Sequence, residues 1–337
     1  MQDFTLFAGF AGDTDPGRFL SAGLYRSRGA GGAWQSIGEA IAPRPEVRAI
    51  LTDPRAPGRV TVGTEDGLWR SDDAGATFRR LAAPRPGLAV WSLARDASNP
   101  DTIFAGYEPA LVVRSRDDGA TFEELPVDVA YPDVTAAMPK RILGIATDPA
   151  NGDEIYAALE IGGMIRSLDG GRTWAGITEG TYINEDSVDF HAVATRPGRP
   201  GTVTGATRIG TFRSTDRGAR WRDLAVPPLR PRGTYCRVLA HAPDDPDTLY
   251  VGGGNDFDGD LGGLFMTRDD GRSWTRFDLG RPLKTSIFGL ALSPRLPGFV
   301  ACTTKIGEVF VSADRGRSWQ CNPLPAGLGH VFALAVA

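Results

Sequence analysis

The sequence has 337 residues, with 43 glycines, 25 prolines and a formal net charge of −4. Arginine is spread along the chain instead of being gathered into one basic patch, which excludes the electrostatic footprint of a nucleic-acid-binding protein. No run of about 18 apolar residues occurs, so we expect no membrane-spanning helix. The many glycines and prolines are typical of a chain dense in turns.

A short pattern, Ser/Thr-x-Asp-x-Gly-x-Thr/Ser-aromatic, recurs along the whole chain. In chain order its copies, here called boxes, occupy residues 27–34, 71–78, 115–122, 167–174, 214–221, 267–274 and 312–319. The first box is degenerate, because Gly29 stands where the others have Asp, and Arg220 takes the Thr/Ser position of the fifth. Neighbouring boxes begin 44 to 53 residues apart, which is the length of one propeller blade.

Each box lies between two short apolar runs and therefore predicts a β-hairpin. The Asp and Ser/Thr side chains are expected to bind backbone amides inside the turn, and the Gly supplies the backbone freedom that the turn needs. The aromatic residue is expected to pack beneath the hairpin. We interpret the box as a structural fastener on the outer side of a blade, with no chemistry of its own.

A second repeated run follows each box and predicts the innermost strand of a blade. Small residues recur at one position of these runs, with Val238 as the exception: Ala49, Ser92, Gly144, Ala192, Gly289 and Ala333. Such residues suit strands that converge on an axis. The last run has no downstream strands and the first hairpin has no inner strand. We therefore expect residues 330–337 to complete the blade begun by residues 3–37, which removes exposed sheet edges.

The boxes resemble the Asp-box (BNR) repeat of sialidases, sortilin-type propellers and photosystem assembly-factor propellers. This resemblance covers nearly the whole chain and implies an all-β fold, a seven-bladed β-propeller of four-stranded antiparallel blades. Seven blades use essentially all of residues 1–337, so we expect a single domain. Sialidase activity is not expected, because Asp-box sialidases have six blades and an Arg-Ile-Pro-type motif near the N-terminus that this chain lacks.

Polar side chains are predicted where the inner strands begin and in the facing loops, the usual ligand-binding face of a propeller. One repeat position carries Arg48, Trp91, His191 and Arg237, with Leu143, Phe288 and Phe332 in the other blades. Burying charged groups without partners is costly. The cluster therefore forms either a charge-paired, solvated channel mouth or a small-molecule site.

The residue types at this mouth predict acid–base chemistry and anion binding. Histidine exchanges protons near neutral pH, and the predicted catalytic groups are His191, His330, Tyr235, Glu160 and Glu108. Arginine suits a carboxylate or an oxyanion, and the predicted ligand-binding residues are Arg48, Trp91, Arg141, Arg237, Tyr107 and Lys305. We expect a hydrolase or lyase that takes a small-molecule ligand in its central channel. A non-catalytic interaction or assembly scaffold is the alternative.

A divalent metal is a further prediction. Acidic residues alternate with glycines around Asp256, Asp258 and Asp260, as in a calcium loop, although the closing Glu of an EF-hand is missing, and a flexible acidic loop is the alternative. His191 and His330 with a carboxylate are a second possible set of ligands, for Mg²⁺ or Zn²⁺. Segments 12–20, 127–139 and 181–189 are expected to form a rim around the mouth.

Three cysteines without metal-type spacing predict free thiols, and the N-terminal residues do not resemble a signal peptide. We therefore expect a cytoplasmic protein.

Overall fold

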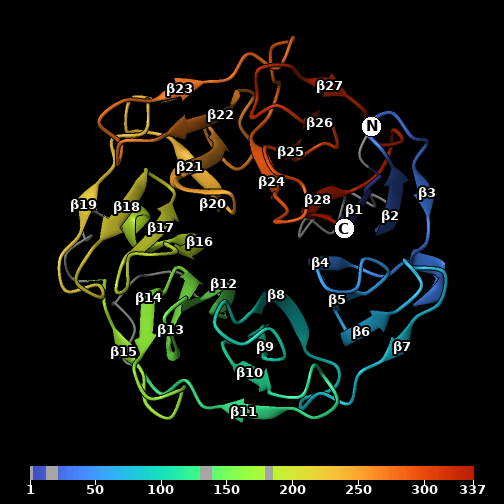
Figure 1. The fold of residues 1–337 in the computed structure, drawn as a ribbon, viewed down its shortest axis with the longest axis horizontal. Helices are drawn as coiled ribbons and strands as arrows, with labels where there is room; N and C mark the ends of the chain where they lie inside the picture. The colour runs from blue at the N-terminus through green and yellow to red at the C-terminus, as the bar shows by residue number, and fades with distance from the viewer. Residues whose placement is uncertain (1–2, 13–21, 130–138, 179–184) are drawn as a thin grey trace.

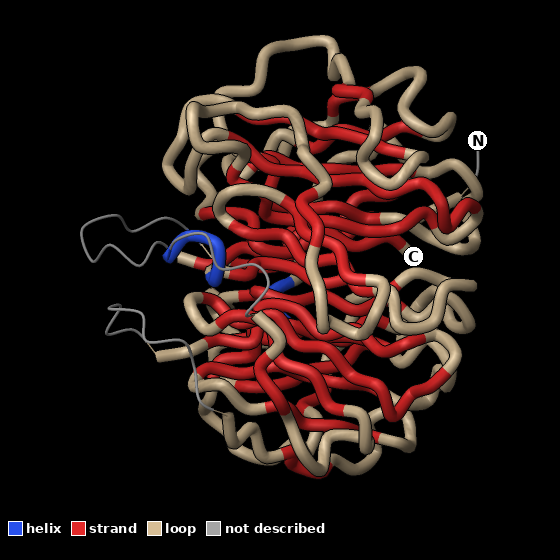
Figure 2. The backbone as a smooth tube through the Cα atoms, turned by 90° about the vertical axis from the view of Figure 1, so that its left-hand side faces the viewer, coloured by secondary structure: helices blue, strands red, loops and turns tan. Residues whose placement is uncertain are grey.

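The computed structural model describes residues 3–12, 22–129, 139–178 and 185–337. Seven four-stranded antiparallel sheets surround a central axis (Figure 1). The fold is therefore all-β and a seven-bladed β-propeller, as the sequence predicts. Seen from the side, the strands cross the molecule between two faces formed by loops (Figure 2). Among the described residues, no helix has the length and the apolar character needed to cross a membrane.

The blades are numbered in chain order. Blade 1 contains β28 (His330–Val336), β1 (Thr5–Ala11), β2 (Gly23–Arg28) and β3 (Gln35–Ser36). Blade 2 contains β4 (Val47–Thr52), β5 (Val60–Thr64), β6 (Gly67–Ser71) and β7 (Arg79–Arg80). Blade 3 contains β8 (Ala89–Arg95), β9 (Ile103–Glu108), β10 (Val112–Ser115) and β11 (Glu123–Leu125).

The remaining blades follow the same order from the axis outward. Blade 4 contains β12 (Arg141–Asp148), β13 (Asn151–Glu160), β14 (Gly163–Ser167) and β15 (Ala175–Gly176). Blade 5 contains β16 (Phe190–Thr195), β17 (Val203–Thr207), β18 (Thr211–Ser214) and β19 (Arg222–Asp223). Blade 6 contains β20 (Tyr235–Ala242), β21 (Asp245–Gly254), β22 (Gly262–Thr267) and β23 (Thr275–Arg276). Blade 7 contains β24 (Ile287–Ala291), β25 (Val300–Thr304), β26 (Val309–Ser312) and β27 (Gln320–Cys321). The short 3-10 helices η1 (Gly38–Ala40) and η3 (Glu185–Val188) lie in the connections.

The two ends of the chain close the ring inside blade 1. Strand β28 pairs antiparallel with β1, with Leu6 opposite Val336 and Phe7 opposite Ala335. Two further backbone hydrogen bonds, of 3.0 and 2.9 Å, join Thr5 and Ala337. The predicted closure of residues 330–337 onto the N-terminal blade is therefore confirmed.

Seven hydrophobic clusters lie at the seven junctions between neighbouring blades. Each cluster receives one box aromatic from the later blade of its junction: Trp34, Phe78, Phe122, Trp174, Trp221, Trp274 or Trp319. The Trp221 indole donates a hydrogen bond back to the Ile177 carbonyl (2.7 Å), and Trp274 does the same to Leu224 (2.9 Å). The box aromatics therefore join blades as well as supporting their own hairpins.

The box turns are held by side-chain hydrogen bonds. In blade 4, the Ser167 hydroxyl accepts the Gly171 amide (2.8 Å), and the Asp169 carboxylate accepts both the amide and the hydroxyl of Thr173 (2.9 and 2.7 Å). The same bonds occur in the boxes of blades 2, 3, 6 and 7. This agrees with the structural role predicted for the pattern.

Arginines fasten the boxes of blades 2 to 6 to the preceding blade. The residue just before the box Ser is arginine in blades 1 to 5, and we call these five the latch arginines: Arg26, Arg70, Arg114, Arg166 and Arg213. Four of them donate to a carbonyl oxygen in the next blade's box, as Arg114 does to Gly170 (2.6 Å). The fifth, Arg213, contacts the Asp270 carboxylate instead. Blades 6 and 7 have Met266 and Val311 at this position.

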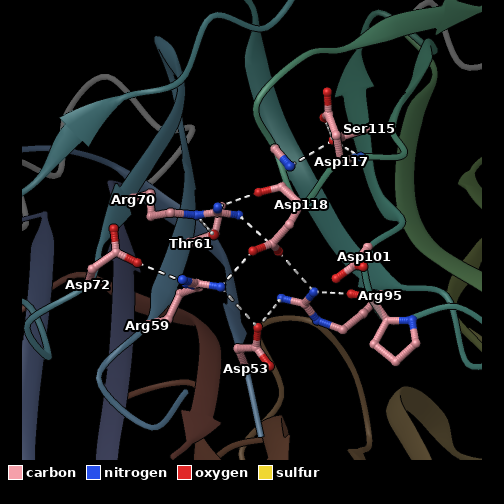
Figure 3. Close-up of polar contacts among 12 residues, drawn as sticks. Asp53, Arg59, Thr61, Arg70, Asp72, Arg95, Asp101, Ser115, Asp117 and Asp118 are labelled. Atoms are coloured by element: carbon pink, nitrogen blue, oxygen red, sulfur yellow. Dashed lines mark hydrogen bonds and ion pairs between the residues drawn. The ribbon is translucent and has the colours of Figure 1, made fainter. Parts of the chain in front are cut away.

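The latch between blades 2 and 3 belongs to a wider charge network (Figure 3). Arg70 donates to the Asp118 carbonyl, and the Asp118 carboxylate pairs with Arg59 at 2.6 Å and Arg95 at 3.2 Å. The fully buried carboxylate of Asp53 lies within 3.5 Å of Arg59 and 3.3 Å of Arg95. Because these charges are compensated, the network is a structural join on the box side of the ring.

Candidate functional site

A cavity of about 290 Å³ lies on the axis and is lined by the inner strands of all seven blades. Its lining contains the whole set that the repeat alignment places at one position, here called the ring residues: Arg48, Trp91, Leu143, His191, Arg237, Phe288 and Phe332. The predicted convergence of these distant residues on one central opening is therefore correct.

The ring residues point inward because each one lies at an irregularity of its inner strand. In blade 2, Val47 pairs with Thr64 and Ala49 pairs with Gly63, so Arg48 between them has no partner in the ladder. The same skip in register occurs in the other six blades. Such β-bulges re-aim a side chain. The fold therefore presents seven side chains to the axis whatever their chemistry.

Trp91 contacts two guanidinium groups, those of Arg48 and Arg141. The Arg48 guanidinium carbon is 4.7 Å from the Trp91 ring centroid, and that of Arg141 is 4.4 Å away. Both distances are within the range of cation–π attraction. Arg141 also pairs with Glu108 at 2.8 Å and Glu160 at 2.7 Å. Two predicted acid–base carboxylates thus lie at the mouth as counterions of Arg141.

A second pair of carboxyl groups lies beside Arg48. Glu46 contacts the Arg48 guanidinium, and its backbone amide donates to the Glu65 carboxyl at 2.8 Å. Burial raises the pKa of Glu65, the negative charge of Glu46 adds to the rise, and the Glu46 amide and Arg48 offset only part of it. A carboxyl group that keeps its proton to higher pH is suited to act as a general acid. Both residues belong to the polar mouth, but the sequence alone gave no reason to prefer them over Glu108 and Glu160.

His191 is held on both sides of its ring. Its Nδ1 lies 2.7 Å from the Cys236 carbonyl oxygen, and its Nε2 lies 3.3 Å from the Asp189 carboxylate. Burial alone would raise the pKa of Asp189, but His191, the Ile161 amide and Arg208 together hold it below the usual range. The His191 side chain is 1% exposed. Both ring nitrogens of His191 therefore already have a protein partner, and its predicted catalytic role stays a prediction.

The other predicted histidine lies at the same end of the ring. A chain of ring contacts runs from His191 to Tyr235 (4.8 Å between centroids), then to Phe288 (6.4 Å), Phe257 (5.6 Å) and His330 (6.1 Å). Tyr235 is 2% exposed, and burial raises the pKa of its hydroxyl. His191 and His330 thus share one face, as predicted, and aromatic rings link them.

Two predicted ligand contacts occupy other positions. Tyr107 is fully buried in the hydrophobic cluster between blades 2 and 3, and burial raises the pKa of its hydroxyl. Lys305 has a 3% exposed side chain, and its Nζ donates to the Asp258 carboxylate (2.6 Å) and the Phe257 carbonyl (3.1 Å). Lys305 therefore ties the loop that carries these residues to blade 7.

The acidic loop directs its carboxylates to different partners. Asp256 pairs with Arg208 (3.3 Å) and Arg230 (3.4 Å), Asp258 pairs with Lys305, and Asp260 accepts from the Asn255 amide (2.9 Å). In the part of the chain that the structure describes, no group of three or more His, Cys, Asp or Glu residues is arranged to hold a metal. The calcium site predicted at Asp256, Asp258 and Asp260 gains no support from this geometry. Within the predicted rim, residues 13–20, 130–138 and 181–184 lie outside the described residues.

Arg237 differs from the other cations at the mouth. Its guanidinium carbon lies 5.0 Å from the Phe288 ring centroid, and the residue is 9% exposed. Among the described residues it has no ion-pair or hydrogen-bond partner, whereas Arg48 and Arg141 each contact a glutamate. The cavity thus contains one uncompensated positive charge.

Comparison with known proteins finds partial sequence similarity to xyloglucanases. No family model matches the chain. It is 25% identical over 302 residues to a probable oligoxyloglucan-reducing end-specific xyloglucanase of Neosartorya fischeri, covering 72% of this chain and 36% of that protein. It is 27% identical over 326 residues to a xyloglucanase of Hypocrea jecorina, covering 81% of this chain and 38% of that protein. The chain thus spans well under half the length of these curated relatives.

Solved structures extend the comparison at the level of the fold. The GH74 enzyme of Niastella koreensis matches with a TM-score of 0.65 and 20% identity, covering 82% of this chain and 45% of that one. YCF48 from Cyanidioschyzon merolae matches with a TM-score of 0.57 and 14% identity, covering 84% of this chain and 87% of that one. These likenesses agree with the propeller, and the sequence relatives that match are hydrolases.

Proposed function

We propose that this chain is a hydrolase of saccharides, with one end of the saccharide held at the axial cavity. The similarity to xyloglucanases supports the reaction class, although it covers only part of those proteins. The observation that carries the proposal is the carboxyl pair Glu46 and Glu65 beside the ring residue Arg48. Glycoside hydrolysis uses two carboxyl groups in different protonation states.

The two carboxyl groups have different environments, which assigns their roles. Glu65, with its raised pKa, donates a proton to the leaving oxygen as the glycosidic carbon–oxygen bond breaks. Glu46, held by Arg48, accepts a proton from the water whose oxygen bonds to the same carbon. Proton exchange with solvent then restores both groups. This assignment favours Glu46 and Glu65 over Glu108 and Glu160, because the latter two share the guanidinium of Arg141, whereas Glu65 has no ion-pair partner among the described residues.

Release of reducing ends from xyloglucan and glucuronoxylan tests the proposal. Glu65→Gln is expected to lower kcat by at least about 100-fold, since general acid catalysis contributes about 10²–10⁴-fold. Glu124→Gln is the matched control, because Glu124 lies on β11, the outer strand of blade 3, and pairs there with the exposed Arg85. Activity should also fall as pH rises through the pKa of Glu65. Full activity in the folded Glu65→Gln variant contradicts the proposal.

A non-catalytic binding protein is the second candidate. The observation that favours it is the ion pairing of Arg141 with both Glu108 and Glu160, which leaves these groups compensated without any reaction. The likeness in fold to YCF48, of which this chain covers 87%, agrees with this candidate, because another structure shows YCF48 bound to a D1 peptide. A scaffold would bind saccharide or peptide with equal affinity in the wild type and in Glu65→Gln, and it would never release reducing ends. Calorimetry and the reducing-end assay on one preparation separate the two candidates.

A further inference from the structure

The two arginines of the ring, Arg48 and Arg237, differ in whether a counterion accompanies them. Arg48 has a carboxylate partner in Glu46, whereas Arg237, which is nine-tenths buried, has none among the described residues. A buried cation without a counterion is unfavourable in a protein interior. An anion that enters the cavity removes this cost, so the cavity favours negatively charged ligands.

The unpaired polar atoms of the ring have one chemical character. In the described part of the chain, Nε and Nη1 of Arg48 and Nε1 of Trp91 are buried without hydrogen-bond partners. All three are donors, and both residues line the cavity together with Arg237. A ligand that satisfies them must offer acceptor oxygens. A carboxylate does so with two oxygens that match the fork of a guanidinium.

Aromatic side chains around Arg237 hold its guanidinium in a position to bind a carboxylate. Its guanidinium lies over the Phe288 ring, and Phe288 in turn contacts Tyr235, Phe257 and Phe332. Two positions further along each inner strand, the cavity wall is aliphatic, with Ile50, Leu93, Ile145, Val193, Leu239, Leu290 and Leu334. The cavity volume of about 290 Å³ limits the ligand to roughly one small ring with its substituents.

We propose that the axial cavity binds a saccharide end that carries a carboxylate, with Arg237 as the principal anion-binding residue. This inference rests on the proposed function for the saccharide part of the ligand. The carboxylate part follows from the guanidinium of Arg237, which has no counterion among the described residues, and from the donor character of Arg48 and Trp91. Binding of the carboxylate makes the axial cavity selective for uronic acids over neutral sugars of the same size.

Isothermal titration calorimetry with D-glucuronate and D-glucose tests this selectivity, because the two sugars differ only at the carboxylate carbon. Glucuronate is expected to bind at least ten times more tightly than glucose, and less tightly as salt concentration rises. Arg237→Gln is expected to abolish the preference. Arg268→Gln is the matched control, since Arg268 is exposed and pairs with Asp245 away from the cavity. Equal affinity for the two sugars, or an unchanged preference in Arg237→Gln, overturns the proposal.

Two further measurements keep the outcomes separate. If Arg237→Gln does not fold, Arg48→Gln replaces it, and a lost preference for glucuronate in that variant supports the same cavity. In the wild type, binding of glucuronate without any release of reducing ends from xyloglucan or glucuronoxylan contradicts the proposed function and leaves the anion site standing. Hydrolysis of xyloglucan by a protein that does not prefer glucuronate contradicts the anion site alone.

Discussion

The outer box layer and the axial ring are built from the same sevenfold repeat, yet they differ in how their side chains vary. In the boxes of blades 2 to 7, the same Ser/Thr, Asp and Gly make the same hydrogen bonds. At the ring position, the backbone bulge is shared by all seven blades, but its side chain is Arg, Trp, Leu, His, Arg, Phe or Phe. Uniform side chains on a uniform backbone mark a structural device.

The ring shows the opposite combination, a uniform backbone with varied side chains. A packing role alone would be met by similar apolar residues in every blade. Instead, charged and aromatic residues are brought together from blades that are distant in sequence, and one of the charges, Arg237, is uncompensated among the described residues. We therefore assign stability to the box layer and ligand recognition to the ring. The four predictions below test this division.

Removal of residues 329–337 is expected to have the largest effect. The deletion takes away β28, exposes the β1 edge and removes Val331, Leu334 and Val336 from the cluster between blades 7 and 1. The newly unpaired edge of β1 can pair with other chains, which favours aggregation. We expect loss of the cooperative thermal transition, measured by circular dichroism. A shortened chain that melts as the wild type does would show that closure does not stabilise the fold.

Breaking one latch tests the box layer. In Arg114→Met, the Gly170 carbonyl loses its guanidinium donor, and Glu123 loses the closer of its two arginine partners. Methionine already occupies this position in blade 6, as Met266, so the side chain suits the site. Removal of a hydrogen bond to a charged group costs about 1.5–3 kcal/mol. Urea denaturation measures this loss, and a variant as stable as the wild type contradicts the role of the latch.

The sequence was sufficient for the fold because the boxes set the blade length and the unmatched ends required closure. It was also sufficient for the ring, since alignment of the inner runs placed Arg48, Trp91, His191 and Arg237 at one position. The β-bulge that turns them inward was not predictable from alternation, because a bulge breaks the period of two. The repeat alignment found the position without needing the bulge.

The interaction partners of these side chains could not be predicted from the sequence. Tyr107 lies one residue before the mouth-side end of β9, the second strand of blade 3, yet its side chain lies in the cluster between blades 2 and 3. Arg141 binds Glu108 and Glu160, which come from two different blades. Such pairings depend on side-chain directions that are set by packing between blades. A repeat pattern gives the location of a residue along the axis and leaves its partner open.

The box layer also predicts a response to acid. Hydrogen bonds from the hydroxyl and the amide of the box Thr or Ser, and from the first box Ser or Thr, lower the pKa of four box carboxyls to about 2: Asp117, Asp169, Asp269 and Asp314. Because their folded pKa values lie below the usual value of 3.8, these groups stabilise the fold above about pH 4. That contribution is lost as pH falls from about 4 to 2.

The free energy of unfolding, measured in urea at several pH values, checks this acid response. Asp169→Asn is expected to show a smaller decrease between pH 4 and 2 than the wild type, because one of the titrating carboxyls is gone. Asp278→Asn serves as the control, since Asp278 lies in the loop after β23 and outside any box. An identical pH dependence in Asp169→Asn and the wild type would contradict a stabilising role for the ionised box.

The smallest effect on stability is expected for Arg237→Met, the same chemical change as Arg114→Met placed in the ring. Arg114 donates to two partners, so its loss leaves the Gly170 carbonyl without a guanidinium donor and leaves Glu123 with only the exposed Arg116 at 3.5 Å. Arg237 has no such partner among the described residues, and methionine fills the space over Phe288 without a buried charge. Replacing a buried cation that has no counterion by an apolar side chain is expected to leave the free energy of unfolding unchanged or to raise it. Urea denaturation should therefore show that Arg114→Met lowers the free energy of unfolding relative to the wild type, whereas Arg237→Met leaves it unchanged or raises it. If Arg237→Met is as destabilised as Arg114→Met, then the ring position is a structural device like the box, and the division between the two layers fails.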